Sequence, residues 1–210
     1  LETVADTFGG ASIPSTGMTQ IFYNCFKLRE VPSSLAGATP NNLSSTFSNC
    51  YRIKSIPALS YASVTNMSNT FQNCYSLESF PVTTFPVLTI FSNTFDGCKS
   101  LTSIELTFNS VTTMASAFNV CERLESVQLT TPNTLTNTSS MFNGCSKITR
   151  VNAFNTSYVT TAGSMYGGRS IEVIPAHDFS RVTSITSIFS TANVSRVLAT
   201  GIKITASVSG

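Results

Sequence analysis

The sequence predicts an α/β solenoid of about eight units, each 23–25 residues long and each carrying a short helical piece and a short strand. Three observations support this fold class. An aromatic residue returns at a fixed period, a helical pattern surrounds it, and an alternating apolar pattern follows it. The repeat extends over residues 1–210 as a single domain, without a linker or a second domain.

The aromatic positions set the period of the repeat. They are Phe22, Phe47, Phe71, Phe95, Phe118, Phe142, Tyr166 and Phe189. A period of this size indicates a solenoid, because so short a unit cannot bury its apolar face alone and must stack on its neighbours. Phe8 lies only 14 residues before Phe22, so residues 1–21 are interpreted as a truncated first unit.

A helical pattern is expected around each aromatic residue. In the third unit, Thr65 stands six residues before Phe71 and Met67 stands four residues before it. Thr or Asn just ahead of an apolar i, i+4 pair is typical of a helix N-cap. Asn or Gly two residues after the aromatic, as at Asn73, is typical of a helix end. Each unit is therefore predicted to contain a capped helix of about two turns.

An alternating pattern follows in each unit. Residues 101–106 read LTSIEL and residues 124–129 read LESVQL, which predicts short strands with one buried face and, once per unit, a parallel sheet. Four strand positions are followed by proline: Pro32, Pro57, Pro81 and Pro175. Because proline lacks the ladder donor, the sheet should be irregular there. Residues 198–210 alternate as well and are predicted to form a C-terminal capping strand.

Six cysteines stand three residues after the aromatic of their unit: Cys25, Cys50, Cys74, Cys98, Cys121 and Cys145. Equivalent positions in a solenoid form a column along its axis, so we predict a buried ladder of free thiols beside the ladder of Phe anchors. Disulfides between neighbouring units and metal binding are the alternatives, although no C-x₂-C spacing favours zinc.

Composition gives little support for several function classes. Charged residues make up 10% of the chain and the net charge is +2, which provides no strong attraction to nucleic acid. No apolar run approaches the roughly 18 residues that span a bilayer, so no membrane insertion is expected. The chain starts in mid-pattern at Leu1, so we interpret it as a processed chain or a piece of a longer protein.

No catalytic site stands out in the sequence. The serines recur with the repeat, and no glycine-rich phosphate motif is present. His177, the only histidine, is expected in a surface loop. We therefore predict a protein that is not an enzyme and that needs no metal or cofactor.

The unit resembles a known repeat family. FQNCYSL at residues 71–77, FDGCKSL at 95–101 and FNGCSKI at 142–148 resemble BspA-like leucine-rich repeats, and SVTNMSNTF at 63–71 is similar to repeats of mycoplasma-type surface lipoproteins. The resemblance covers roughly residues 4–198, although Arg169 and Ala192 stand where Cys is expected. It implies a right-handed superhelix with a parallel β-sheet on the concave face, short helices on the convex face and no catalytic motif.

The resemblance also implies a function. Members are commonly exposed adhesion or host-interaction proteins, which favours a cell-surface or extracellular module that binds a host protein or glycan. The alternative is a structural or receptor-binding component of a phage virion, such as a tail fibre or decoration protein, within a larger assembly. The concave face is the usual contact surface of the family. The residues expected to point outward on it are Arg29, Glu30, Lys54, Glu78, Glu105, Gln128, Arg150, Asn152 and Arg196.

A column of cations precedes the strands: Lys27, Arg52, Lys99, Arg123, Lys147 and Arg169. We interpret it as a solvated edge, with attraction of anionic glycans as the alternative. No aromatic cluster is expected on the concave face, so no energetic hot spot is predicted.

Overall fold

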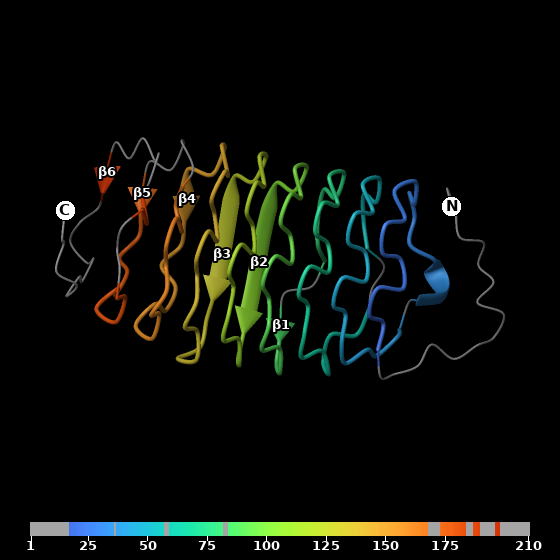
Figure 1. Ribbon diagram of the computed structural model, residues 1–210, viewed down its shortest axis with the longest axis horizontal. Coiled ribbons are helices and arrows are strands. Elements are labelled where there is room, and N and C mark those ends of the chain that lie inside the picture. Colours follow the sequence, from blue (N-terminus) through green and yellow to red (C-terminus); the bar gives the residue numbers. More distant parts are fainter. Residues whose placement is uncertain are drawn as a thin grey trace.

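The computed structural model describes residues 17–35, 37–56, 59–81, 84–167, 173–183, 187–189 and 196–197. In this part the chain runs through successive coils that lie side by side along the long axis of the molecule (Figure 1). The predicted capping strand at residues 198–210 and most of the predicted first unit, residues 1–21, lie outside the described residues.

In the described residues, six short strands form one parallel sheet. They are β1 (Thr84–Phe85), β2 (Ser103–Phe108), β3 (Ser126–Thr130), β4 (Arg150–Val151), β5 (Val173–Ile174) and β6 (Arg196–Val197). Their order in the sheet is their order in the sequence, and each described pair is parallel. Ser103 of β2 aligns with Ser126 of β3, which aligns with Arg150 of β4. Equivalent positions of consecutive units therefore lie side by side.

The sheet is shorter than the sequence predicts. In the described coils before β1, no strand forms at the expected positions of Val31, Ile56 and Phe80. Each of these residues precedes a proline, which cannot donate to a neighbouring strand. A following proline does not by itself prevent pairing, since Ile174 of β5 precedes Pro175 and pairs with Val197. By contrast, β2 and β3 contain no proline and reach 6 and 5 residues with alternating burial.

The prediction of short helices on the convex face is wrong for the described residues. They contain no α-helix, and their single 3₁₀ helix is η1 (Ser33–Leu35). The segment around each aromatic is a ribbon of turns instead. The N–H of Phe47 donates to the carbonyl of Thr70 in the next coil at 2.9 Å, whereas the N–H of Ser48 donates to Ser45 three residues back at 3.2 Å.

Two left-handed residues per coil explain why the ribbon is not a helix. They stand two residues before and two residues after the aromatic, as at Ser45 (φ 54°) and Asn49 (φ 63°). A left-handed residue ends a right-handed helix, so two of them four residues apart leave no room for a helical turn. The Asn and Gly positions interpreted as helix ends, such as Asn73 and Gly97, are left-handed, but they close turns.

The threonines interpreted as N-caps form a ladder that links the coils. The N–H and the hydroxyl of Thr65 both donate to the carbonyl of Asn41 in the preceding coil, at 2.9 and 3.2 Å. Thr89 makes the same pair of bonds to Thr65, at 3.0 Å each. The ladder continues through Thr112, Thr136 and Thr160. The threonine of each coil therefore donates hydrogen bonds to the preceding coil, and the ribbon of turns donates hydrogen bonds to the next coil.

The core consists of columns of equivalent side chains. The Phe anchors from Phe22 to Phe142 are buried and stack on one another with ring centroids 5.3–5.8 Å apart. The cysteines are free thiols, with Cys25 half-buried and the other five buried. Each buried thiol donates a hydrogen bond to the backbone carbonyl of the Phe anchor in the preceding coil, at 3.0–3.2 Å. Cys74, for example, donates to the carbonyl of Phe47. Burial raises the pKa of the Cys50 thiol to about 12, so it is unreactive at neutral pH.

Candidate functional site

Most of the candidate contact residues are exposed on the strand side of the coils. These are Arg29, Glu30, Lys54, Glu78, Glu105 and Gln128. Glu105 of β2 and Gln128 of β3 are register partners, so the outward face of the sheet is continuous there. Arg150 and Arg196 belong to β4 and β6, but their side chains lie outside the described part of the chain.

Asn152 is half-buried and makes structural contacts. Its side-chain carbonyl accepts a hydrogen bond from the N–H of Leu129 at 2.7 Å, and its amide donates to the carbonyl of Leu129 at 2.8 Å. The side chain thus continues the ladder between β3 and the residues that follow β4. We assign Asn152 to the fold rather than to the contact surface.

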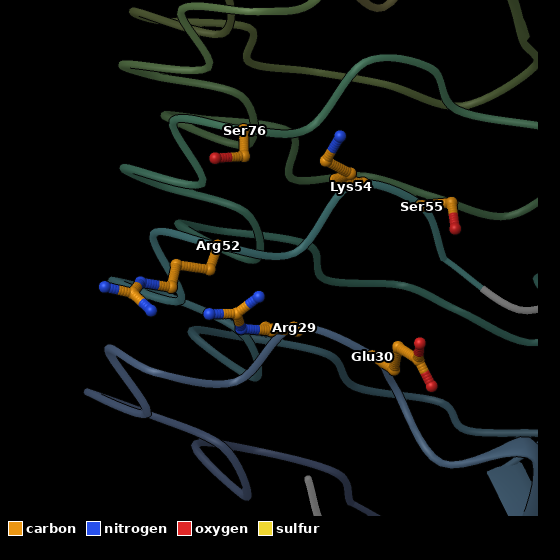
Figure 2. A pocket seen from close by; sticks show the side chains of 6 residues that line it. All are labelled: Arg29, Glu30, Arg52, Lys54, Ser55 and Ser76. Carbon is orange, nitrogen blue, oxygen red and sulfur yellow. The ribbon is translucent and has the colours of Figure 1, made fainter. Parts of the chain in front are cut away.

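A hollow of about 660 Å³ lies on the outward side of the first described coils. It is lined by Arg29, Glu30, Arg52, Lys54, Ser55 and Ser76. The side chains of Arg29 and Arg52 extend in the same direction, and Glu30 and Ser55 lie on the opposite side (Figure 2). Three cations line the hollow with one carboxylate, so it carries an excess of positive charge.

The two arginines of the hollow have no carboxylate partner within the described residues. Lys54 Nζ lies 3.3 Å from Glu78 Oε1, and both side chains are largely exposed. Elsewhere in the described ranges, an ion pair joins Lys99 and Glu122 at 2.7 Å, and its hydrogen bond raises the pKa of Lys99. Exposed pairs of this kind contribute little to stability, because solvent screens the attraction between the charges.

A partly exposed column of three aromatic rings, Phe26, Tyr51 and Tyr75, lies in the same coils as the hollow, and its central ring, Tyr51, is half-buried. The ring centroids are 5.1 Å apart between Phe26 and Tyr51 and 4.7 Å apart between Tyr51 and Tyr75. Phe26 is 47% exposed and Tyr75 is 37% exposed. Lys99 takes the equivalent position in the next coil, with Nζ 5.6 Å from the centroid of Tyr75.

Sequence reasoning missed this column, although a signal was present. The aromatic residue directly follows the cysteine in the first three units and is absent from that position in the later ones. The cation column is largely exposed, as expected for a solvated edge, at Lys27, Arg52, Arg123 and Lys147. Lys99 is half-buried, and Arg169 lies outside the described residues.

The prediction that His177 lies in a surface loop is wrong. The side chain is 1% exposed, and its ring packs 5.0 Å from Phe154 and 5.3 Å from Phe179. Its Nε2 is hydrogen-bonded to the hydroxyl of Tyr166. Burial lowers the pKa of His177 to about 4, so the imidazole is neutral at pH 7 and serves the core.

The described ranges contain no group of three His, Cys, Asp or Glu side chains placed to hold a metal ion. Within the same ranges, no helix is long and apolar enough to cross a bilayer. The hollow and the aromatic column in the same coils are therefore the features that we consider for function.

The chain matches a known repeat family. The profile of the BspA type leucine rich repeat region matches the chain in 6 copies, over residues 12–84 and 64–197. These ranges contain the hollow and the aromatic column. Comparison with curated proteins and with solved structures gives no match.

Proposed function

The chain belongs to the BspA-type leucine-rich repeat family, a kind of repeat that generally serves in protein interactions, and we propose that it is a surface-exposed, non-enzymatic adhesion module that binds a host protein or glycan. Repeat solenoids suit this task because their stacked units create extended surfaces on which neighbouring coils contribute side chains. The family supports the placement of the protein outside a cell or on its surface.

The observation that carries the proposal is the hollow with its two arginines, which have no carboxylate partner among the described residues. Arg29 and Arg52 come from consecutive coils and extend in the same direction (Figure 2). Ser76 occupies the position of Arg52 in the next coil, and that coil keeps the same buried Phe and Cys. Arg52 is thus not needed to build a coil. Arginine is enriched at protein contact surfaces, so its presence here supports a binding role.

A binding screen tests the proposal. The purified chain is presented to a panel of host matrix proteins and glycans in biolayer interferometry. The double variant Arg29→Ser/Arg52→Ser should bind its partner about tenfold more weakly, because both guanidinium contacts are lost. The matched control is Arg123→Ser/Lys147→Ser, which removes two exposed cations away from the hollow and should change binding less than about twofold.

Two outcomes would contradict the proposal. One is the absence of binding to every member of the panel. The other is an equal loss of binding in the control variant, because this would indicate nonspecific attraction to positive charge rather than a site.

A further inference from the structure

Resting on the function proposed above, we propose that the contact surface is the edge formed by Phe26, Tyr51 and Tyr75 together with Arg29 and Arg52. We call it the aromatic–arginine edge. We further propose that its partner is a protein segment in which carboxylates alternate with apolar side chains. This places the site on the first coils rather than over the longest strands of the sheet, β2 and β3.

The rings and the residues that line the hollow belong to the same coils. The N–H of Ser76 donates to the carbonyl of Tyr51 at 3.1 Å, and the N–H of Glu78 donates to the carbonyl of Lys54 at 3.1 Å. Neighbouring coils are therefore aligned along this whole stretch. Tyr51 directly precedes Arg52 and Tyr75 directly precedes Ser76, so in two consecutive coils a ring is the chain neighbour of a residue that lines the hollow.

The geometry of the rings favours a protein partner over a neutral glycan. Sugars bind aromatic residues by laying their C–H face on the face of a ring. Here the rings lie on one another, with interplanar angles of 27° and 12°, so neighbouring rings cover the faces between them and the ring edges meet solvent. Apolar side chains of a protein pack on such edges, and Tyr and Arg are the residues that dominate protein contact energies.

The charges favour a carboxylate-bearing segment over an anionic polysaccharide. A guanidinium group binds a carboxylate through two parallel hydrogen bonds, and Arg29 and Arg52 each supply one guanidinium group. A polyanion that followed the axis of the coils would meet Glu30 in the hollow and Glu78 at its border. It would also meet a gap in the cation column at Ser76. Single carboxylates on a peptide avoid these obstacles.

The exposed column is not a requirement of the fold. Lys99, Glu122 and Ser146 occupy its position in the following coils. Those coils keep the buried Phe and Cys ladders unchanged. Half-exposed aromatic rings that the core does not need are typical of an interaction site.

The test uses peptide probes and the full chain. An array of short peptides that alternate Asp or Glu with Leu, Phe or Tyr is compared with matched peptides carrying Asn or Gln, and with heparin as a sulfated polysaccharide. Binding is measured by fluorescence anisotropy. We expect acidic–apolar peptides to bind about tenfold more tightly than their amide counterparts. Their affinity should fall several-fold when salt rises from about 0.05 to about 0.3 M.

Variants locate the site. Tyr51→Ala and Arg52→Glu should each weaken peptide binding about tenfold. The matched control is Tyr158→Ala, which removes a 40% exposed ring in a coil distant from the proposed edge. The centroid of this ring lies 4.5 Å from the guanidinium carbon of Arg181. It should change affinity less than about twofold. Circular dichroism verifies folding, and Arg52→Glu keeps the test decisive if Tyr51→Ala does not fold, because Arg52 is exposed.

Each contrary outcome overturns the inference. Binding of heparin without binding of peptides would assign the edge to a polyanion, and binding of neither would remove it as a site. An equal loss in Tyr158→Ala would show that the position of the ring does not matter. If a partner from the panel screen binds Tyr51→Ala and Arg52→Glu as well as the unchanged protein, the inference fails while the proposed function stands. If the panel screen yields no partner, the proposed function fails as well.

Discussion

The two columns of stacked aromatic rings in this protein differ in burial and in length. The core column, Phe22 to Phe142, is buried and passes through every coil between those residues. The surface column, Phe26, Tyr51 and Tyr75, is partly exposed and ends after three coils. Both have similar ring spacing, so stacking alone does not separate their roles. The rings of the core column, which recur in every coil from Phe22 to Phe142, build the core. The rings of the surface column, which occur in three coils, are available to recognise a partner.

The sharpest test of this comparison is removal of one ring from each column. Phe95→Ala should lower the free energy of unfolding by about 3–5 kcal/mol, because its ring is fully buried between Phe71 and Phe118. Tyr75→Ala should lower it by about 1 kcal/mol or less, because its ring is 37% exposed. Urea unfolding followed by circular dichroism measures both. Equal losses would contradict the division between core and surface columns.

The core can also be probed at a histidine that is buried in it, His177. Burial gives His177 a pKa of about 4 in the folded chain, against 6.5 as its ordinary value. Because the unfolded chain takes up the proton first, the contribution of His177 is complete above about pH 6.5 and is lost as pH falls towards 4. The expected loss is about 3 kcal/mol.

A variant isolates this effect from the titration of carboxylates. The difference in unfolding free energy between the unchanged protein and His177→Gln should shrink as the pH is lowered from about 6.5 to about 4. A difference that stays constant across this window would show that His177 is not buried as a neutral ring.

The left-handed turns that hold the core column offer a smaller test. Gly97 has φ 74°, and a Cβ placed there would lie 2.6 Å from Oδ1 of Asn73. Gly97→Ala should therefore lower the unfolding free energy by about 1–2 kcal/mol. Gly163→Ala is the matched control, since no atom lies within 4 Å of its added Cβ, and we expect no loss. Thermal unfolding would contradict the account if both variants lost the same stability.

The smallest expected effect is a gain in stability. Val120 adopts φ 54° at the position where other coils have Asn or Gly. A β-branched residue is strained in this conformation, whereas Asn tolerates it. Val120→Asn should therefore raise the unfolding free energy by about 1 kcal/mol. A clear destabilisation would mean that the packing of Val120 outweighs its backbone strain.

The sequence was sufficient to predict the period and the parallel pairing, because both follow from columns of equivalent residues. It did not reveal that the segment around the aromatic is a ribbon of turns. Thr65, Met67 and Phe71 have the spacing of a capped helix, and the same spacing fits a ribbon whose N–H groups bond the next coil. The signal that distinguishes the ribbon of turns from a helix is the polar residue two positions before the aromatic, such as Ser45 or Asn69, which adopts a left-handed conformation.

The candidate site was only partly predictable, because it depends on which side chains meet across coils. Alternation placed Arg29 and Lys54 on the outward side, where both are exposed. Their meeting with Arg52 in one hollow requires the pairing of the coils, which a list of charged positions does not give. His177 was misplaced for a related reason, since the pocket between Phe154 and Phe179 that buries it comes from two coils.

Hydrogen–deuterium exchange of the full chain tests the central claim most directly. Exchange is compared with and without the tightest-binding acidic–apolar peptide of the array. The account predicts that the peptide slows exchange in the first coils, around residues 26–29, 51–55 and 75–79. Slower exchange confined to β2 (Ser103–Phe108) and β3 (Ser126–Thr130) would contradict it, because the partner would then lie on the outward face of the sheet rather than on the aromatic–arginine edge.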